Sequence, residues 1–300
     1  MSSGKSWRVL IGDADVTEFV ESVTWSGDLQ QASRTLNVKL VRECRPDVGD
    51  GASFYYQGKR LFTGTVTYVD MDAWNNSVEC SDRGIYLANN YTFKEYKGTP
   101  QSIAKKVCAE FGVSTGNLAQ KSSTTKVTST GNLSAFKVIE EAYEGKRKGA
   151  KQYLYLFWDG KLTIEPAGSE TVADLDIEIL TARRSRSIKG MVNKVVILND
   201  KSKQSGYVEN AADRSKYGTF QKTYKKEKDK NARTEAKESL VGLERTGSIT
   251  CLGNPACIAG KAVNVTEKRT GISGAQVIKS DKHTFTSASY EMSLEFYYSS

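Results

Sequence analysis

The side chains that could do chemistry in this 300-residue sequence are few and far apart. There is one histidine, His283, in the segment Asp281-Lys282-His283-Thr284-Phe285-Thr286, and we expect it to lie just before a strand. A Ser/His/Asp or Cys/His arrangement would have to be built around it, because imidazole is the usual proton acceptor in such sites. No Gly-x-Ser-x-Gly motif places a nucleophile beside it. We therefore expect His283 to be a structural or surface residue.

Paired carboxylates are the second kind of candidate. Glu140 and Glu141, or Asp70 and Asp72, have the residue types of a glycosidase acid and base. That reaction depends on the separation of the two carboxyl groups, which a sequence does not supply, and adjacent carboxylates are typical of solvated surface. No P-loop or dinucleotide-binding motif is present.

The cysteines give no metal or disulfide pattern. They are odd in number and irregularly spaced: Cys44, Cys80, Cys108, Cys251 and Cys257. The closest pair, Cys251 and Cys257, lacks the second ligand pair that a structural zinc site needs. We predict a protein that is not an enzyme, with no catalytic, cofactor-binding or metal-binding residues and no cofactor.

The charge is moderately basic, with 43 Lys and Arg against 35 Asp and Glu and a net charge of +8. Part of the excess lies in two runs: Arg183, Arg184, Arg186 and Lys189, and then Lys222, Lys225, Lys226, Lys228 and Lys230. Specific nucleic-acid binding would need these runs interleaved with exposed aromatic residues or placed on a recognition helix, and the sequence indicates neither clearly, so we favour solvated loops or helix starts. An acidic protein partner is the second interpretation. The sequence lacks a secretory h-region and a membrane-spanning apolar stretch, which predicts synthesis in a reducing cytoplasm and no membrane partner.

The elements that would hold these residues are mainly strands. Residues 1–92 contain short alternating apolar runs, such as Thr35 to Val41, separated by turns such as Gln57-Gly58. Residues 93–185 add a helix opened by Thr99-Pro100, a Ser/Thr-rich surface stretch from 114 to 130, a helix from about Ser134 and an Asp159-Gly160 hairpin. Strand patterns return in residues 186–300, with one helix expected from Asn231 to Leu243.

Two parts of the chain share a rhythm. In each, a glycine is followed by a strand, a turn, a glycine-containing strand and a further strand. Gly49 lies 15 residues before Gly64, and Gly260 lies 14 residues before Gly274. Because glycine within a strand often marks a bulge or a close backbone approach, its recurrence favours an internal duplication. The alternative is that any two β-meanders look alike in sequence.

The ordered motifs resemble a known family. The segment Val48-Gly49-Asp50-Gly51 through Leu61-Phe62-Thr63-Gly64-Thr65-Val66 is similar to the first barrel of phage baseplate hub proteins, including the late control protein D group. The segment Cys80 to Leu87, the two predicted helices and the Phe157-to-Leu162 hairpin resemble the parts that follow, and Gly260 to Leu294 resembles the closing barrel. The likeness covers nearly the whole chain and is to the compact version found in prophages and phage-tail-like bacteriocins.

The resemblance implies a fold class and a function. The fold would be mainly β with an α+β insert: two similar small β-barrel domains, 1–92 and 186–300, flanking a two-helix plus hairpin domain, 93–185. The function would be that of a structural baseplate hub in a contractile injection system, a homotrimer whose two barrels per chain form a pseudo-sixfold ring joining the hexameric tail tube to the trimeric spike. Wedge proteins, and optionally the tape-measure protein, would be further partners. The protein would be assembled in the bacterial host cytoplasm and reside in the baseplate of a virion or phage-tail-like particle.

Two other functions remain open from the sequence. A tail-associated peptidoglycan hydrolase would use some of the paired carboxylates, and a basic module would bind cell-wall polymer or nucleic acid through the lysine runs. Clearing of cell walls in a zymogram, or salt-dependent retention on heparin, separates these alternatives from a hub.

Overall fold

The structure, a computed structural model, describes residues 5–145, 152–176, 179–226 and 231–297. Strands dominate these residues and the helices are short, which confirms the prediction of a mainly β chain. The residues form two compact units. The larger holds the described residues up to Ala182 and from Ser248 to Phe296, and the smaller holds those of Arg183–Gly247. The division of the chain at 92/93 and 185/186 stays a prediction.

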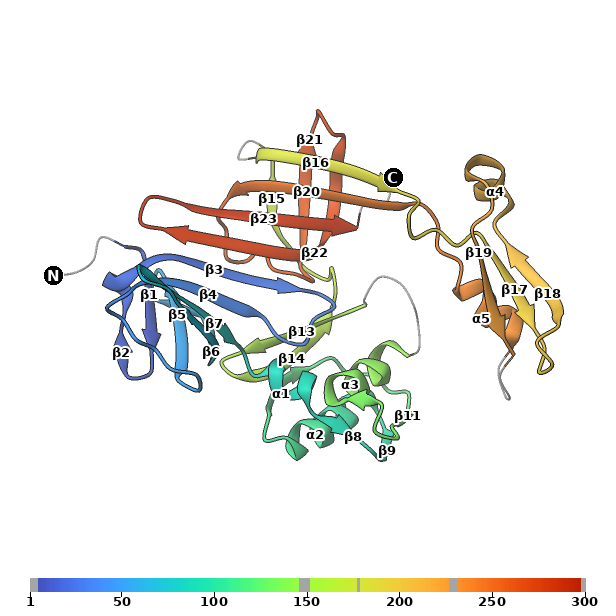
Figure 1. Cartoon of the computed structure of the whole chain (residues 1–300), viewed down its shortest axis with the longest axis horizontal. Coiled ribbons are helices and arrows are strands. Elements are labelled where there is room, and N and C mark those ends of the chain that lie inside the picture. Colours follow the sequence, from blue (N-terminus) through green and yellow to red (C-terminus); the bar gives the residue numbers. More distant parts are fainter. Residues whose placement is uncertain (1–4, 146–151, 177–178, 227–230, 298–300) are drawn as a thin grey trace. The chain divides into compact units, whose positions relative to one another are not determined.

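One large sheet dominates the structure (Figure 1). Its strands follow the order β16-β20-β23-β22-β3-β4-β7-β6-β5-β1-β2, with β21 also on β22 and β15 on β21. Their bounds are β1 Trp7–Ile11, β2 Ala14–Asp15, β3 Val20–Asp28, β4 Thr35–Val41, β5 Gly51–Tyr56, β6 Lys59–Met71, β7 Asn75–Ser81, β15 Thr171–Leu175, β16 Ile179–Ser187, β20 Glu244–Leu252, β21 Ala262–Glu267, β22 Ile272–Thr286 and β23 Tyr290–Tyr297. A short 3-10 helix, Thr17–Phe19, precedes β3. Side chains alternate between core and solvent, as in β4, where Leu36, Val38 and Leu40 are buried and their neighbours are not.

The predicted duplication is visible as two antiparallel meanders, β5-β6-β7 and β21-β22-β23. The same hydrogen bonds begin both. Gly49 has φ +99° and donates its N–H to the carbonyl of Val66 over 2.9 Å, and Gly260 has φ +91° and donates to the carbonyl of Ile278 over 2.8 Å. In return, Val66 and Ile278 donate to the carbonyls of the residues that follow the two glycines. Each long strand then has a bulge directly after Val66 or Ile278.

The strand register shows that Gly64 and Gly274 are not at equivalent positions in the two meanders. Gly64 pairs with Ala52, and the equivalent position in the second meander is Gln276, which pairs with Val263. Gly274 therefore lies two residues away from the place of Gly64. Gly64 does mark a close approach, because a Cβ there would lie 2.2 Å from the carbonyl oxygen of Ser81.

Each meander belongs to a larger group of strands with the same order. We define the first β-unit as β3, β4, β5, β6 and β7, and the second as β16, β20, β21, β22 and β23. The sheet order is β3-β4-β7-β6 in the first and β16-β20-β23-β22 in the second. The two units join edge to edge, since Ser280–Thr286 of β22 pairs antiparallel with Ser22–Asp28 of β3. One hydrophobic core lies under the first β-unit and includes Phe285 of the second β-unit.

The α+β part follows the first unit in sequence and has its own core. It contains the predicted helices α2, Pro100–Glu110, and α3, Ala135–Glu144, and the hairpin β13–β14, Tyr153–Trp158 and Lys161–Pro166. Its other elements are α1 Gly84–Asn89, β8 Tyr91–Thr92, β9 Glu95–Gly98, β10 Ser114–Leu118, β11 Thr125–Thr128 and β12 Leu133–Ser134. The Ser/Thr-rich stretch from 114 to 130 lies largely at the surface, as expected, but it contains two strands: β10 pairs with β14 and β11 with β9, so strand pairing overrides the polar composition.

Local signals in this part are largely confirmed. Asp159 and Gly160 have φ of 49° and 72°, as the hairpin turn requires. Ser134 accepts the N–H of Lys137 as an N-cap. Pro100 occupies the first turn of α2, but the Thr99 side chain makes no capping bond.

The smaller unit is a three-stranded sheet, β18-β17-β19, with two short helices. Its elements are β17 Lys194–Leu198, β18 Gln204–Glu209, α4 Ala211–Tyr217, β19 Gln221–Lys225 and α5 Ala232–Glu238. The helix expected from Asn231 to Leu243 is too long, because the chain leaves it at Ser239 and Val241 then bridges to Val192. The sequence reading missed α4, whose face has no buried residue and hence no apolar periodicity to detect.

Candidate functional site at the junction of the two β-units

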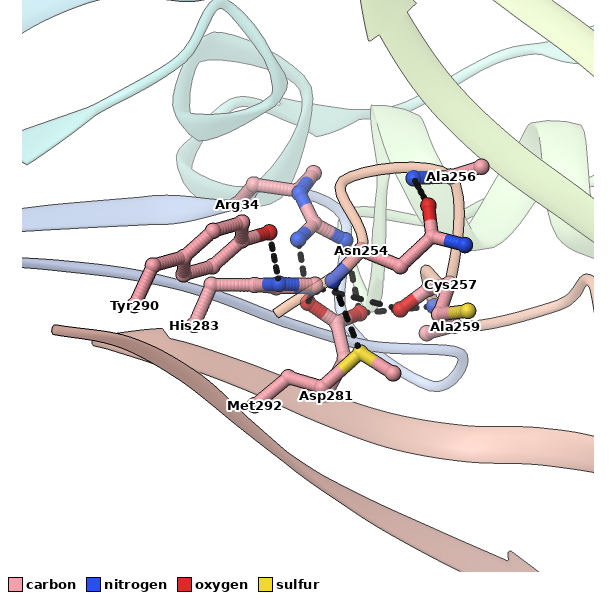
Figure 2. Close-up of polar contacts among 9 residues, drawn as sticks. All are labelled: Arg34, Asn254, Ala256, Cys257, Ala259, Asp281, His283, Tyr290 and Met292. Carbon is pink, nitrogen blue, oxygen red and sulfur yellow. Dashed lines mark hydrogen bonds and ion pairs between the residues drawn. The ribbon is translucent and has the colours of Figure 1, made fainter. Parts of the chain in front are cut away.

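A group of buried polar side chains lies where the two β-units join (Figure 2). Asp281 and His283 come from β22, Tyr290 begins β23, and Arg34 directly precedes β4. Asp281 and His283 are completely buried, and Arg34 is 7% exposed. The loop between β20 and β21 closes the group with Cys257 and Ala259.

Arg34 and Asp281 form a two-point ion pair. The Nη1 and Nη2 atoms of Arg34 donate to Oδ1 and Oδ2 of Asp281 over 2.9 and 2.5 Å. The guanidinium also lies 4.1 Å from the ring of Trp25 on β3. Gly27 leaves room for this arrangement, since a Cβ there would lie 2.2 Å from Nη1 of Arg34. The pair therefore ties the segment before β4 to the β22 strand across the junction.

His283 extends the network to β23 and to the adjoining loop. Its Nε2 lies 3.1 Å from the carbonyl oxygen of Cys257 and 3.3 Å from Oδ2 of Asp281, and its Nδ1 lies 2.9 Å from the Tyr290 hydroxyl. Since the carbonyl can only accept, Nε2 carries the proton. The backbone N–H of Ala259 donates to Oδ1 of Asp281 over 2.6 Å. Both imidazole nitrogens and both carboxylate oxygens therefore have partners.

Burial and neighbouring charge set the protonation states. Burial alone would raise the pKa of Asp281, but Arg34 and His283 outweigh it and lower the pKa to about 2. Burial, with smaller contributions from Cys251 and Asp281, raises the pKa of the Cys257 thiol to about 12. Burial likewise raises the pKa of Tyr290. The carboxylate is thus ionised at neutral pH while the thiol and phenol keep their protons.

This arrangement links strands of the two β-units through buried side chains. An Asp-His-Tyr series resembles the order of a catalytic relay, but His283 has no exposed surface through which a substrate could reach it. Cys257 is also buried and protonated, so it is no nucleophile. Within the part of the chain that the structure describes, no group of three or more His, Cys, Asp or Glu side chains could hold a metal ion.

The structure places His283 inside β22, so the expectation that it precedes a strand is wrong; its side chain is buried and hydrogen-bonded to Cys257 and Tyr290. Glu140 lies on α3 and pairs with Lys137 over 2.5 Å, and Asp72 accepts the N–H groups of a turn. Cys251 and Cys257 are both buried free thiols. No strong sequence signal pointed to Arg34, because 247 residues separate it from Asp281.

The basic runs belong to other elements than this cluster. Arg183, Arg184 and Arg186 belong to β16, and Lys222 and Lys225 belong to β19. Lys228 and Lys230 lie outside the described residues. No helix among the described residues combines the length and apolar character that a membrane span requires.

A second candidate is a pocket of about 420 Å³ beside the β13–β14 hairpin. Trp158 and Leu156 line one side, and the loop between β20 and β21 lines the other. Lys261 lies in its wall and pairs with Glu165 over 2.8 Å and with Glu170 over 2.6 Å. Three of the charged groups in the pocket wall, Lys261, Glu165 and Glu170, therefore pair with one another.

Solved structures with the same fold come from phage tails and a related secretion system. A prophage MuSo2 43 kDa tail protein from Shewanella oneidensis matches with a TM-score of 0.72 and 14% identity, over 98% of this chain and 96% of that chain. A tail protein from Neisseria meningitidis MC58 matches with a TM-score of 0.73 and 14% identity, over the same shares. An Escherichia coli component of the type VI secretion system, described as structurally similar to phage T4 tail proteins, matches with a TM-score of 0.55 and 9% identity, over 97% of this chain and 75% of that chain.

Sequence comparison gives the family. No curated protein matches the sequence. The YQBQ-like family model matches residues 23–297, which include both β-units, the α+β part and the smaller unit. The chain belongs to the YQBQ-like family.

Proposed function

We propose that this protein is a structural baseplate hub of a phage tail or phage-tail-like particle, and that it works as a homotrimer. The observation that carries the proposal is the repeated strand order, β3-β4-β7-β6 and β16-β20-β23-β22, joined through β22 and β3. The likeness of the fold to prophage tail proteins supports it. Each β-unit would contribute one small barrel-like segment to a ring.

The free edges of the chain are complementary. In the first β-unit, the part of β6 that follows Val66 corresponds to the part of β22 that pairs with β3. Among the described residues, that part of β6 pairs with β7 alone. The first strand in the sheet order is β16, which has the place in the second β-unit that β3 has in the first. An unpaired edge is a template for another strand, so β6 of one copy would pair with β16 of the next.

Charge favours the same pairing. The β16 strand carries the exposed Arg183 and Arg186, and the end of β6 and its turn carry the exposed Asp70 and Asp72. A contact between two different edges is heterologous and closes into a ring when the rotation allows. Three copies would present six similar β-units, so that a threefold spike can meet a sixfold tube.

The ring assigns partners to the two faces of the hub. We propose that the tail tube, and optionally the tape-measure protein, binds one face and the spike the other, while the α+β part contacts baseplate wedge proteins. Assembly would take place in the cytoplasm of the bacterial host, before the particle carries the protein out.

Light scattering on the purified chain, alone and mixed with the spike protein of the same particle, tests the proposal. We expect a mass of three chains in at least one of these samples. An Arg183→Glu and Arg186→Glu double variant should weaken trimers, whereas Lys222→Glu, on β19, should not. A folded chain that stays monomeric in both samples would contradict the proposal.

A further inference from the structure

The β22–β23 hairpin shows how one β-unit anchors itself on the next. Its tip lies between β3 and β5 of the first unit. Phe285 is completely buried there and packs edge-on against Phe54, with ring centroids 4.8 Å apart. Tyr290 packs against Tyr56 at 5.0 Å, and the Trp7 indole donates to the carbonyl of Thr286 over 3.1 Å. At the junction inside the chain, the hairpin tip is thus anchored by aromatic side chains that pack against the first β-unit.

The tip of the equivalent hairpin in the first β-unit, β6–β7, is exposed to solvent. Met71 and Trp74 at its tip are 61% and 75% exposed, and Tyr68 on the adjacent edge is 58% exposed. The tip is nevertheless well ordered by hydrogen bonds, since Oδ1 of Asp72 accepts the N–H groups of Trp74 and Asn75 over 2.6 and 2.7 Å. A large exposed aromatic side chain on a hydrogen-bonded turn has the character of an interface anchor.

Among the described residues, the equivalent site in the second β-unit is an open groove. A groove of about 930 Å³ lies between Ile179–Ala182 of β16 and Thr266–Thr270 at the end of β21 and its turn. In the first unit, β3 and β5 take the places of β16 and β21, and the hairpin tip of β22–β23 occupies the space between them. The described residues therefore include an exposed hairpin, β6–β7, and an open groove beside β16, which lie at different places in the sheet order.

We propose that the β6–β7 hairpin of one copy inserts Trp74 and Met71 into this groove of a second copy. The inference rests on the proposed trimer and names the contact that closes it. Charge supports the occupant, because Asp70 and Asp72 on the hairpin would face Lys268 and Arg269 on the groove rim. The buried ion pair of the inner junction has no counterpart here, since Val69 stands where the second unit has Asp281. The contact between copies is thus anchored by apolar side chains.

Cross-linking tests the contact directly. In a background with Cys44→Ser, which removes the one cysteine that is not buried, Trp74→Cys and Leu180→Cys are placed on separately tagged chains. Mixed chains treated with a short bismaleimide, with spike protein added if trimers need it, should give a linked pair of both tags. Phe93→Cys, which is 85% exposed in the α+β part, is the matched control and should not link to Leu180→Cys.

Self-association measured by sedimentation gives the second readout. Trp74→Glu should weaken each contact by roughly 30-fold or more, as loss of an interface anchor does, while Phe93→Glu should leave it unchanged. Trp74→Phe should retain most of the affinity. Trimers that form normally with Trp74→Glu and give no 74–180 link would overturn this inference and leave the hub proposal intact. A chain that never trimerises, alone or with spike, would overturn both.

Discussion

Neutralising Asp281 should destabilise the larger unit strongly. In Asp281→Asn, the guanidinium of Arg34 loses the charge that balances it, and the Ala259 N–H loses its carboxylate acceptor. Arg34 cannot simply turn toward water, because its side chain is 9% exposed and its guanidinium lies 4.1 Å from the Trp25 ring. A buried charge left without its partner is the costly case for an ion pair.

The expected loss follows from that burial. Removing one partner of a buried ion pair costs about 3–5 kcal/mol of unfolding free energy. In a unit of this size each kcal/mol lowers Tm by about 2–4 °C, so the variant should melt about 10 °C below the wild type. Urea denaturation followed by tryptophan fluorescence measures the loss, because Trp25 lies in contact with the cluster.

Two further variants control this measurement. Glu21→Gln removes the exposed Lys39–Glu21 pair, whose atoms lie 2.9 Å apart, and should cost no more than about 1 kcal/mol. Arg34→Met combined with Asp281→Leu removes both charges and should recover much of the stability that Asp281→Asn loses. If Asp281→Asn costs no more than Glu21→Gln, the assignment of the junction to this ion pair is wrong.

Two other predictions concern pH and the paired glycines. The pKa of Asp281 is about 2 in the folded chain, below its ordinary 3.8, so its carboxylate stabilises the fold above pH 4 and loses that effect as the pH falls toward 2. Over that range the wild type should lose about 2 kcal/mol of unfolding free energy that Asp281→Asn does not lose. Urea titration at each pH measures the difference. Gly49 and Gly260 both have a positive φ, so replacing either with alanine should cost about 1 kcal/mol of unfolding free energy. A Cβ at Gly260 would also lie 2.7 Å from the Leu154 side chain, so Gly260→Ala should cost about 1–3 kcal/mol more. Equal losses in thermal melts would show that space around Gly260 is not limiting.

The order of strands and turns in both meanders can be predicted from the sequence, because turn residues and alternating apolar residues are local signals. Gln57-Gly58 and Asp159-Gly160 identify their turns, and Met292, Leu294 and Phe296 alternate as a half-buried strand does. The long strand β22 could not be read as one element, since its first part faces β21 and its second part faces β3 and β23. Its burial pattern therefore changes along its length.

The candidate site was hidden for a different reason. Arg34, Asp281 and His283 look like ordinary surface residues in sequence, because a charged residue usually lies in solvent. Only the edge pairing of β22 with β3 brings them together and buries them. The sequence did not predict the strand at Ser114–Leu118 for the same reason, since this strand forms through its pairing with β14 and not through its own propensity.

The central claim is that three chains make a ring of six similar β-units. Electron microscopy of the tail particle, with this protein labelled and resolved in the baseplate, tests it most directly. We predict three copies around one axis, with β6 of each copy beside β16 of its neighbour and the α+β part outside the ring. Any other number of copies, or free β6 and β16 edges in the assembled particle, would contradict this account.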